Sequence, residues 1–346
     1  MLVIDGTFGS GGGQILRTAL ALGAILQKPF VIKNIRARRP KPGLMPQHLA
    51  GVNLAVQLCQ AKVKGAQPGS TELKFLPDTI RSVNLTVDVA EARGSAGAVT
   101  LIAQAIVPIM LFAPHPCNAT LRGGTHVPFS PIFEYLKMVL LPFISKLGYQ
   151  AEAEITGWGF YPVGGGEIKL HTEPVKKERF NGIDCLSPGG LKGLNLISRV
   201  SRLPLSIATR QADRLESLLK LELKEKQIGE VPARCPGTYL FLNPVYENVS
   251  VGFSALGKKG KPAETVADEV YQAFCTHEKS QKALDPHLAD QVVLFFALTE
   301  KPFSFTTSEV TDHLQTNIWL LNQFLPSNRI ELIKNSDGSG LVRNQL

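Results

Sequence analysis

Three stretches of the sequence carry residue types that could bind or transfer phosphate. The first is a glycine-rich run, DGTFGSGGGQILR at residues 5–17, which follows a short apolar stretch and leads into an apolar segment of helical character. Glycine permits positive φ and close backbone approach, so successive N–H groups can converge on an anion at the start of a helix. The run matches neither the GxxxxGK loop nor the GxGxxG fingerprint of nucleotide-binding proteins. A phosphate-binding loop and a tight turn between strand and helix therefore both stay open.

The second stretch, KNIRARRPKPGLMPQHLAG at residues 33–51, is strongly basic. Its five cations within nine residues are Lys33, Arg36, Arg38, Arg39 and Lys41. Guanidinium groups bind phosphate oxygens, often bidentately. Two prolines stiffen this loop, and a helix is predicted to start near Pro46, with Gln47 and His48 in its first turn. The pattern fits an anion site or a solvated run of charge.

The third stretch, TTSEVTDHLQTNIWLLNQF at residues 306–324, places His313 between a predicted strand and a predicted helix. An imidazole can attack phosphorus and form a phosphoramidate that later transfers its group. The spacing alone does not separate such a nucleophile from a structural or surface histidine. The other six histidines show no HxxxH or HExxH spacing, and the five cysteines form no CxxC pair, so we expect neither a zinc site nor a disulfide framework.

Composition favours a protein with a sizeable core and a polyanionic partner. The chain has 346 residues, of which 44% are hydrophobic, and its net charge is +8. A basic surplus attracts phosphates. The longest apolar run, residues 101–114, is too short to span a bilayer and contains Gln104 and Pro108. With no visible signal peptide, we expect a soluble cytoplasmic protein that does not enter a membrane.

Strand pairs and helices alternate along the chain, which indicates an α/β protein. Glycine clusters at residues 11–14, 123–125 and 164–167 each lie beside an apolar segment. The alternation of strand pairs and helices suggests a repeated α/β unit of about 80–90 residues. Composition shifts after Phe180, and the later segment 287–326 returns to the earlier style. The intervening block is therefore expected to be inserted into a larger domain.

Seven motifs, taken in order, resemble those of RNA 3′-terminal phosphate cyclases. They are DGTFGSGGGQILRTALAL, IRARRPKPGLMPQHL, GSAGAVTLIAQAIVP, GGTHVPFSP, GFYPVGGGE, LADQVVLFFAL and DHLQTNI, and together they cover nearly the whole chain. The resemblance implies an α/β (α+β) fold with a large domain of three repeated α/β units at residues 1–183 and 280–346. It also implies a smaller α/β domain, residues 184–279, inserted before the third repeat.

The resemblance further implies an ATP-dependent conversion of an RNA 3′-phosphate to a 2′,3′-cyclic phosphate. His313 would attack the α-phosphorus of ATP and form a histidyl–AMP, and the AMP would pass to the RNA 3′-phosphate. The neighbouring 2′-OH would then expel AMP. ATP would be the co-substrate, Mg²⁺ or Mn²⁺ the metal, and RNA with a 3′-phosphate the partner, with no obligate protein partner. A non-catalytic, cyclase-like RNA-binding protein and an enolpyruvyl-type transferase are the alternatives.

Roles for single residues also follow from the resemblance. The implied nucleotide-binding residues are Gln14, Arg17, Gln104, Pro131, His287, Asp290 and Gln291, with Pro131 and His287 flanking the adenine. The implied RNA- and phosphate-binding residues are Arg36, Arg39, Gln47 and His48. Two positions depart from the family pattern. Ser10 stands where a metal-binding glutamate is usual, and Arg38 stands where glycine is usual, so Arg38 would compensate, extend the RNA path or point to solvent.

Overall fold

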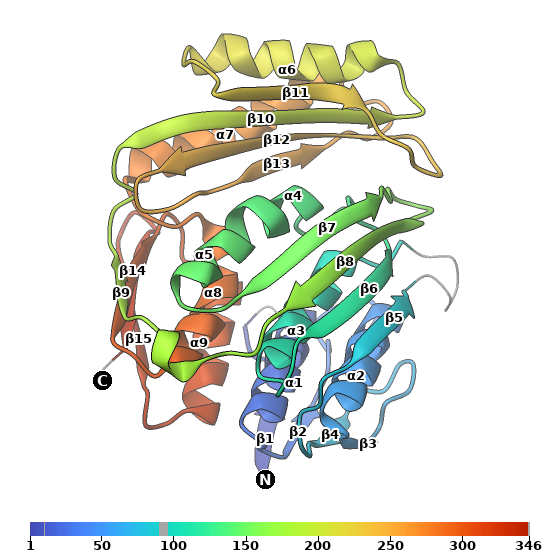
Figure 1. Ribbon diagram of the computed structural model, residues 1–346, viewed down its shortest axis with the longest axis vertical. Helices are drawn as coiled ribbons and strands as arrows, with labels where there is room; N and C mark the ends of the chain where they lie inside the picture. Colours follow the sequence, from blue (N-terminus) through green and yellow to red (C-terminus); the bar gives the residue numbers. More distant parts are fainter. Residues whose placement is uncertain (10, 90–95, 345–346) are drawn as a thin grey trace.

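The computed structural model describes residues 1–9, 11–89 and 96–344 (Figure 1). These residues form four sheets, each of four strands. The α/β class predicted from the sequence is confirmed. None of the helices in this part of the chain is long and apolar enough to cross a membrane.

The first repeated unit follows the order strand, helix, strand, helix, strand, strand. Its elements are β1 (Leu2–Asp5), α1 (Gly13–Ile25), β2 (Phe30–Lys33), α2 (Pro46–Cys59), β3 (Lys62–Lys64) and β4 (Leu73–Leu76). The sheet order is β1-β2-β4-β3, in which the first pair is parallel and the other pairs are antiparallel. A parallel pair needs a crossover connection, and α1 supplies it.

The second unit repeats this topology with longer strands. Its elements are β5 (Asn84–Asp88), α3 (Val99–Leu111), β6 (Cys117–Gly123), α4 (Phe133–Tyr135), the π-helical turn η1 (Leu136–Leu140), α5 (Leu141–Lys146), β7 (Ala151–Gly157) and β8 (Gly166–Thr172). The sheet order is β5-β6-β8-β7, again with only the first pair parallel. The elements α4, η1 and α5 follow one another without a gap from Phe133 to Lys146.

The third unit has the same topology but is interrupted after its first strand. After the short 3₁₀ turn η2 (Lys177–Arg179), its elements are β9 (Ile183–Cys185), α8 (Pro286–Thr299), β14 (Phe303–Thr307), α9 (Asp312–Phe324), β15 (Ile330–Lys334) and β16 (Gly340–Asn344). β9 pairs in parallel with β14, and the order is β9-β14-β16-β15. The pairing therefore places Cys185 in the third sheet, although about 100 residues separate β9 from α8.

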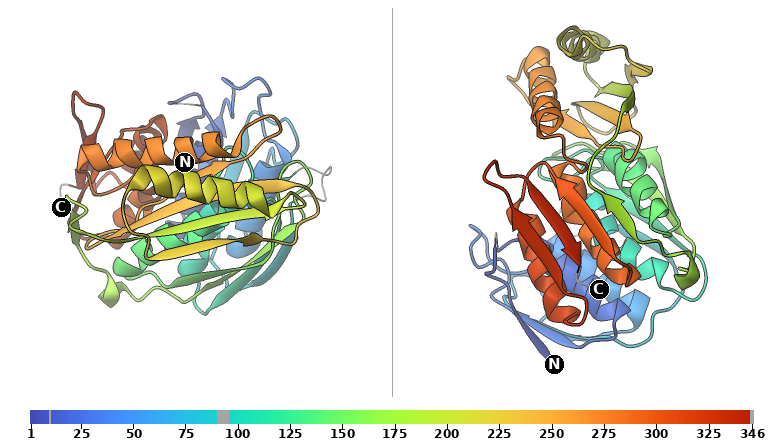
Figure 2. Two further views of the ribbon diagram at one scale, coloured as in Figure 1. Left: turned by 90° about the horizontal axis from the view of Figure 1, so that it is seen from above. Right: turned by 90° about the vertical axis from the view of Figure 1, so that its left-hand side faces the viewer.

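The fourth sheet lies between β9 and α8 in the sequence. Its elements are β10 (Leu191–Ser201), α6 (Leu205–Leu219), β11 (Glu225–Glu230), β12 (Gly237–Tyr246), β13 (Phe253–Leu256) and α7 (Ala263–Ser280). The sheet order is β11-β10-β12-β13, and α6 and α7 are joined by ion pairs such as Arg210–Glu264 at 2.8 Å. This layer lies above the three repeated units in both figures (Figures 1 and 2). The sequence placed the inserted small domain at residues 184–279; because β9 pairs with β14, we propose residues 191–280 instead.

A buried polar network joins the fourth sheet to the second unit. The Tyr239 hydroxyl of β12 donates to Glu134 at 2.5 Å, and the other Glu134 oxygen lies 2.6 Å from Nε2 of His126. The Tyr239 ring also stacks on His126, with ring centroids 4.2 Å apart. Burial opposes ionisation of Glu134, but His126 and these hydrogen bonds hold the pKa of its carboxyl below the usual value. The network fixes the inserted layer over the repeated units.

The core of the repeated units is built from helices that are buried on nearly every side. In α3, 11 of 13 residues are buried, and in α8 the same number of 14 are buried. A helix that is apolar all round must be enclosed by other elements. The three sheets accordingly lie outside the central helices (Figures 1 and 2). A polar side chain on such a helix is exceptional, and these exceptions mark the site described next.

Candidate active site

A cleft of about 780 Å³ opens between the repeated units and the inserted sheet. Twelve of the residues assigned roles by the family resemblance line it: Gln14, Arg17, Arg36, Arg39, Gln47, His48, Gln104, Pro131, His287, Asp290, Gln291 and His313. They come from all three units. The predicted metal ligand Ser10 lies outside the described residues. The structure thus brings these side chains together, while the role of each stays a prediction.

The glycine-rich loop packs against the helix that carries His313. Gly9 has φ +58°, and a Cβ at this position would lie 2.1 Å from Oγ1 of Thr316 in α9. Glycine is needed here both for the left-handed backbone and for the close approach. The Phe8 ring stacks on Trp319 of the same helix, with centroids 4.2 Å apart. The loop before α1 and the first turn of α9 are therefore fixed relative to each other.

Arg38, the cation where glycine is usual, contacts this loop. Its Nη1 donates to the carbonyl oxygen of Gly9 at 3.0 Å. A Cβ at Gly11, whose φ is +56°, would lie 3.3 Å from the Arg38 Cβ. The exposed Arg38 side chain thus braces the glycine loop. Arg36 is held differently, because its guanidinium donates to the carbonyl oxygens of Lys41 and Gly43 at 2.8 and 3.1 Å.

His48, in the first turn of α2, is a neutral hydrogen-bond donor whose ring lies against the start of α1. Its Nδ1 accepts from the Met45 backbone N–H at 3.1 Å, which leaves the ring proton on Nε2. Burial, with the charges of Arg36 and Arg17, lowers the pKa of His48 to about 3. A Cβ at Gly13 would lie 2.4 Å from Nε2, so glycine at this position admits the ring. At neutral pH the ring can donate to an anion without carrying charge.

Arg17 is a partly buried cation that lines the cleft. Its guanidinium donates to Oε1 of Gln14, one turn earlier on α1. Its Nε is buried and has no hydrogen-bond partner among residues 1–9, 11–89 and 96–344. Burial lowers the pKa of Arg17 to about 10, so it stays charged at neutral pH. A buried positive charge is stabilised by an anionic partner, and a bound phosphate would supply one.

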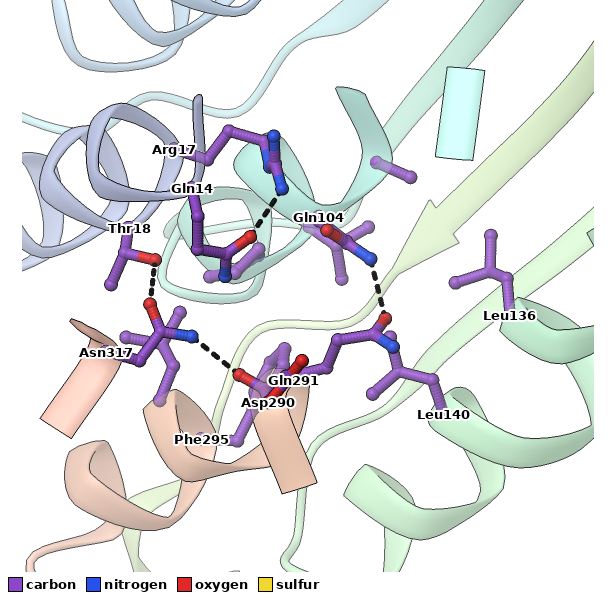
Figure 3. Close-up of a pocket in the computed structure, with 14 residues that line it drawn as sticks. Gln14, Arg17, Thr18, Gln104, Leu136, Leu140, Asp290, Gln291, Phe295 and Asn317 are labelled. Atoms are coloured by element: carbon purple, nitrogen blue, oxygen red, sulfur yellow. Dashed lines mark hydrogen bonds between the residues drawn. The ribbon is translucent and has the colours of Figure 1, made fainter. Parts of the chain in front are cut away.

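Polar side chains of four helices meet beside Arg17 (Figure 3). Gln104 of α3 donates to Gln291 of α8 at 2.8 Å. Asn317 of α9 donates to the carbonyl oxygen of Asp290 at 2.7 Å and accepts from the Thr18 hydroxyl at 2.9 Å. Thr18 and Asn317 were absent from the sequence predictions. Both are buried polar residues on apolar helices, and that contrast is the signal that could have revealed them.

His313 lies in the first turn of α9. Thr311, the N-cap residue of α9, accepts a hydrogen bond from the Leu314 N–H at 3.0 Å through its side-chain hydroxyl. Burial and the nearby charges of Arg17 and Arg39 hold the pKa of His313 below the usual histidine value. Its Nδ1 is buried without a hydrogen-bond partner in the described structure, which leaves Nε2 as the nitrogen able to meet a ligand. The imidazole is therefore neutral and nucleophilic at pH 7.

Asp290 brings the only carboxyl group among the cleft-lining residues of the described chain. Burial, with the nearby charges of Asp285 and Glu309, raises its pKa to about 8, and Thr311 donates a hydrogen bond to it. The group is mostly neutral at pH 7 and suits a divalent cation poorly. No cluster of three or more His, Cys, Asp or Glu side chains with metal-binding geometry occurs among the described residues. These residues alone do not form a metal site.

Several lining residues had no signal in the sequence. Phe129 and Tyr135 of the second unit lie at the cleft, where Tyr135 meets the His287 ring edge-on at 6.3 Å. Phe253 and Ser254 of β13, an edge strand of the inserted sheet, form part of the opposite wall. Only the folded chain brings β13 to this place, because no local pattern records where an inserted layer will dock.

The chain is similar to proteins described as RNA 3′-terminal phosphate cyclases. A family model described as RNA 3′-terminal phosphate cyclase matches residues 8–329. A protein of Methylococcus capsulatus named RNA 3′-terminal phosphate cyclase is 40% identical over 99% of this chain and 96% of its own length. Proteins of the same name from Pyrobaculum aerophilum and Pyrococcus abyssi are 40% and 41% identical, covering 93% and 94% of this chain and 92% and 93% of their own lengths. The chain belongs to the RNA 3′-terminal phosphate cyclase family.

Proposed function

We propose that this chain is an ATP-dependent RNA 3′-terminal phosphate cyclase that acts through a covalent histidyl–AMP. The observation that carries the proposal is the position of His313, whose neutral imidazole lies in the same cleft as the cations Arg17, Arg36 and Arg39. A nucleophile surrounded by positive charge suits attack on a phosphorus whose oxygens are negative. The family membership supplies the substrate class, RNA ending in a 3′-phosphate.

In the first step, Nε2 of His313 attacks the α-phosphorus of ATP. The bond between that phosphorus and the bridging oxygen to the β-phosphate breaks, and pyrophosphate leaves with the electron pair. Arg17 and the Nε2–H of His48 are suited to hold the phosphate oxygens, since one is a cation that lines the cleft and the other is a neutral donor. A nitrogen–phosphorus bond now links the protein to AMP, and the imidazole keeps its Nδ1 proton and carries a positive charge until the next step releases it.

In the second step, an oxygen of the RNA 3′-phosphate attacks the AMP phosphorus and releases His313. In the third step, the 2′-OH of the terminal ribose attacks the activated RNA phosphorus and expels AMP, which leaves the cyclic phosphate. Arg39 and Arg36 lie in the same cleft and offer guanidinium groups to the RNA phosphate. Three substitutions at phosphorus, with pyrophosphate, imidazole and AMP as successive leaving groups, replace one direct loss of hydroxide or water.

We retain the requirement for Mg²⁺ or Mn²⁺ as a prediction from the resemblance. A divalent cation would offset charge on the pyrophosphate as it leaves. Since Asp290 is neutral and isolated, the described residues do not account for such a site, and no step above depends on it. The cytoplasmic location likewise remains a prediction.

The direct test is incubation of the purified protein with ATP labelled at the α-phosphate, with magnesium or manganese. Label should attach to the protein, survive alkali and be lost in acid, as expected of a phosphoramidate. His313→Ala and His313→Asn should carry no label while keeping the wild-type circular dichroism spectrum. Added RNA with a 3′-phosphate should discharge the label and yield a 2′,3′-cyclic end.

Label on His313→Ala would show that another residue is the nucleophile. A folded wild-type protein that takes no label with either metal, yet binds RNA, would favour the non-catalytic RNA-binding alternative.

A further inference from the structure

Phe129 is exposed to a degree that packing does not explain. Its side chain is 102% exposed, whereas its neighbours Val127, Ile132 and Phe133 are between 1% and 4% exposed. A phenylalanine in contact with water contributes nothing to the core and adds to the apolar surface. The apolar residues around it therefore hold the segment in place, and the ring itself is left unused by the fold.

The backbone at Phe129 is also unusual. Its φ is +64°, in the left-handed region that residues with a Cβ rarely adopt. The segment is braced on both sides, because the Ser130 hydroxyl donates to the Val127 carbonyl at 2.9 Å and the Thr100 hydroxyl donates to the Pro131 carbonyl at 2.7 Å. Strained conformations that the surroundings enforce are found preferentially at ligand-binding sites.

The ring lies at the cationic cleft. Phe129 lines it together with Arg36, Arg39 and Gln47, and the edge strand β13 of the inserted sheet, with Ser254, supplies another wall. Single-stranded nucleic acids are bound where a positively charged groove follows the backbone and aromatic rings stack on the bases. A ring with its faces open to solvent, beside arginines that can hold a phosphate, meets both requirements.

We propose that Phe129 is a stacking platform for a base in the 3′-terminal segment of the RNA strand. The inference rests on the proposed function and specifies how the same cleft holds its RNA. The adenine of ATP is a small group that suits an enclosed pocket. The fully exposed Phe129 ring suits instead a base of an RNA strand that continues out of the cleft into solvent. Since every base has a π-face, the platform would favour an unpaired 3′ end over a paired one, with little preference among bases.

The first experiment measures binding and ATP chemistry separately. A short single-stranded RNA with a 3′-phosphate and a 5′ fluorophore is titrated with protein without ATP, and anisotropy gives the Kd. Phe129→Ala should weaken binding between about 5-fold and 150-fold, the range for loss of one base–aromatic stack. Phe129→Leu should weaken it similarly, whereas Phe129→Trp should bind close to wild type. Formation of protein–AMP from labelled ATP, without RNA, should be unchanged in all three variants.

The control is Leu205→Ala. Leu205 is also an exposed apolar side chain, but it begins α6 on the outer side of the inserted layer (Figure 1). Its truncation should alter neither RNA binding nor labelling. Phe129→Gly adds a test of fold against function, because glycine accepts the left-handed backbone. Its melting temperature should equal or exceed that of wild type while its RNA affinity falls as in Phe129→Ala.

The second experiment locates the stacked base. 2-Aminopurine is placed at the last or the penultimate nucleotide of the same RNA, and its fluorescence should be quenched on binding in one of these positions. The quenching should disappear in Phe129→Leu.

Wild-type RNA affinity in Phe129→Ala would overturn the inference while leaving the proposed function intact. Weaker labelling from ATP in Phe129→Ala, with normal RNA binding, would assign the ring to adenine and also overturn it. A wild-type protein that neither takes label nor binds the RNA would overturn the proposed function itself.

Discussion

Replacing Gly9 by alanine should separate the glycine loop from the helix that carries His313. The new Cβ would lie 2.1 Å from Oγ1 of Thr316, far inside van der Waals contact, and the backbone φ is +58°. The left-handed conformation costs alanine about 1–2 kcal/mol, and the overlap adds about 1–3 kcal/mol. The stiffer unfolded chain returns about 0.4–1 kcal/mol. We therefore expect Gly9→Ala to lower the free energy of unfolding by about 2–4 kcal/mol.

A double-mutant cycle with Thr316→Ala tests the steric part of this reasoning. That change removes Oγ1, and the next atom of the side chain, the Thr316 Cβ, lies 3.4 Å from the new methyl group. Alone it also removes the hydrogen bond that Oγ1 donates to the Asp312 carbonyl at 2.6 Å, a loss of about 0.5–1.5 kcal/mol. The double variant should be more stable than the sum of the single effects by about 1–3 kcal/mol, because the overlap is gone.

Urea unfolding followed by circular dichroism gives the four free energies, provided that the m-values agree. Labelling with ATP provides the functional readout, since Gly9→Ala should slow formation of protein–AMP and the second substitution should restore part of the rate. Additive effects within about 0.5 kcal/mol would refute the contact between the loop and α9.

Three further outcomes are expected. Arg39→Ala should raise the RNA concentration needed for half-maximal cyclisation about 10- to 100-fold, from loss of a charge-assisted hydrogen bond, and an unchanged value would remove Arg39 from the RNA site. Ser10→Glu should lower the metal concentration needed for half-maximal labelling, because a carboxylate is the stronger ligand, and an unchanged metal titration would make this departure unimportant. His277 is buried with no hydrogen-bond partner on either ring nitrogen in the described chain, and burial lowers its pKa. Because the folded chain resists protonation of His277, the stabilising contribution of this residue should be complete above about pH 6.5 and be lost on acidification. The melting temperature of wild type should therefore fall more steeply than that of His277→Leu between pH 7 and about pH 5.

The repeated unit could be predicted from the sequence because the alternation of strands and helices within each unit is visible in local stretches of residues. The starts of β1 at Leu2 and β5 at Asn84 are 82 residues apart, within the 80–90 residues expected from the alternation of strand pairs and helices. The order of the strands in the sheet could not be predicted in the same way. β2 pairs with β4 rather than with β3, and no local sequence pattern indicates this pairing. The insertion before the third unit was predicted, but the membership of β9 in that unit was not, because β9 has only three residues and its partner β14 follows more than 100 residues later.

The candidate site, too, was only partly predictable from the sequence. The glycine loop, the basic loop and His313 each stood out through residue type, but only the family resemblance grouped them. Thr18 and Asn317 could have been found as polar exceptions within apolar helices. Phe129 could not, because nothing in a sequence says that a phenylalanine will be left in solvent when the residues beside it are buried.

The repeated topology itself explains why one cleft collects so many anion-binding groups. In each unit a strand passes through a loop into the start of a helix, and the N-terminal turn of a helix carries partial positive charge. Residues in these first turns line the cleft from several central helices: Gln14 on α1, His48 on α2, Leu101 on α3, His287 on α8 and His313 on α9. Their summed field favours phosphate. Burial, together with the charges of Arg17 and Arg36 for His48 and of Arg17 and Arg39 for His313, lowers the pKa of both imidazoles and favours their neutral form. The buried, arginine-lined surroundings that suit a polyphosphate thus also favour the neutral imidazole that the proposed attack by His313 requires.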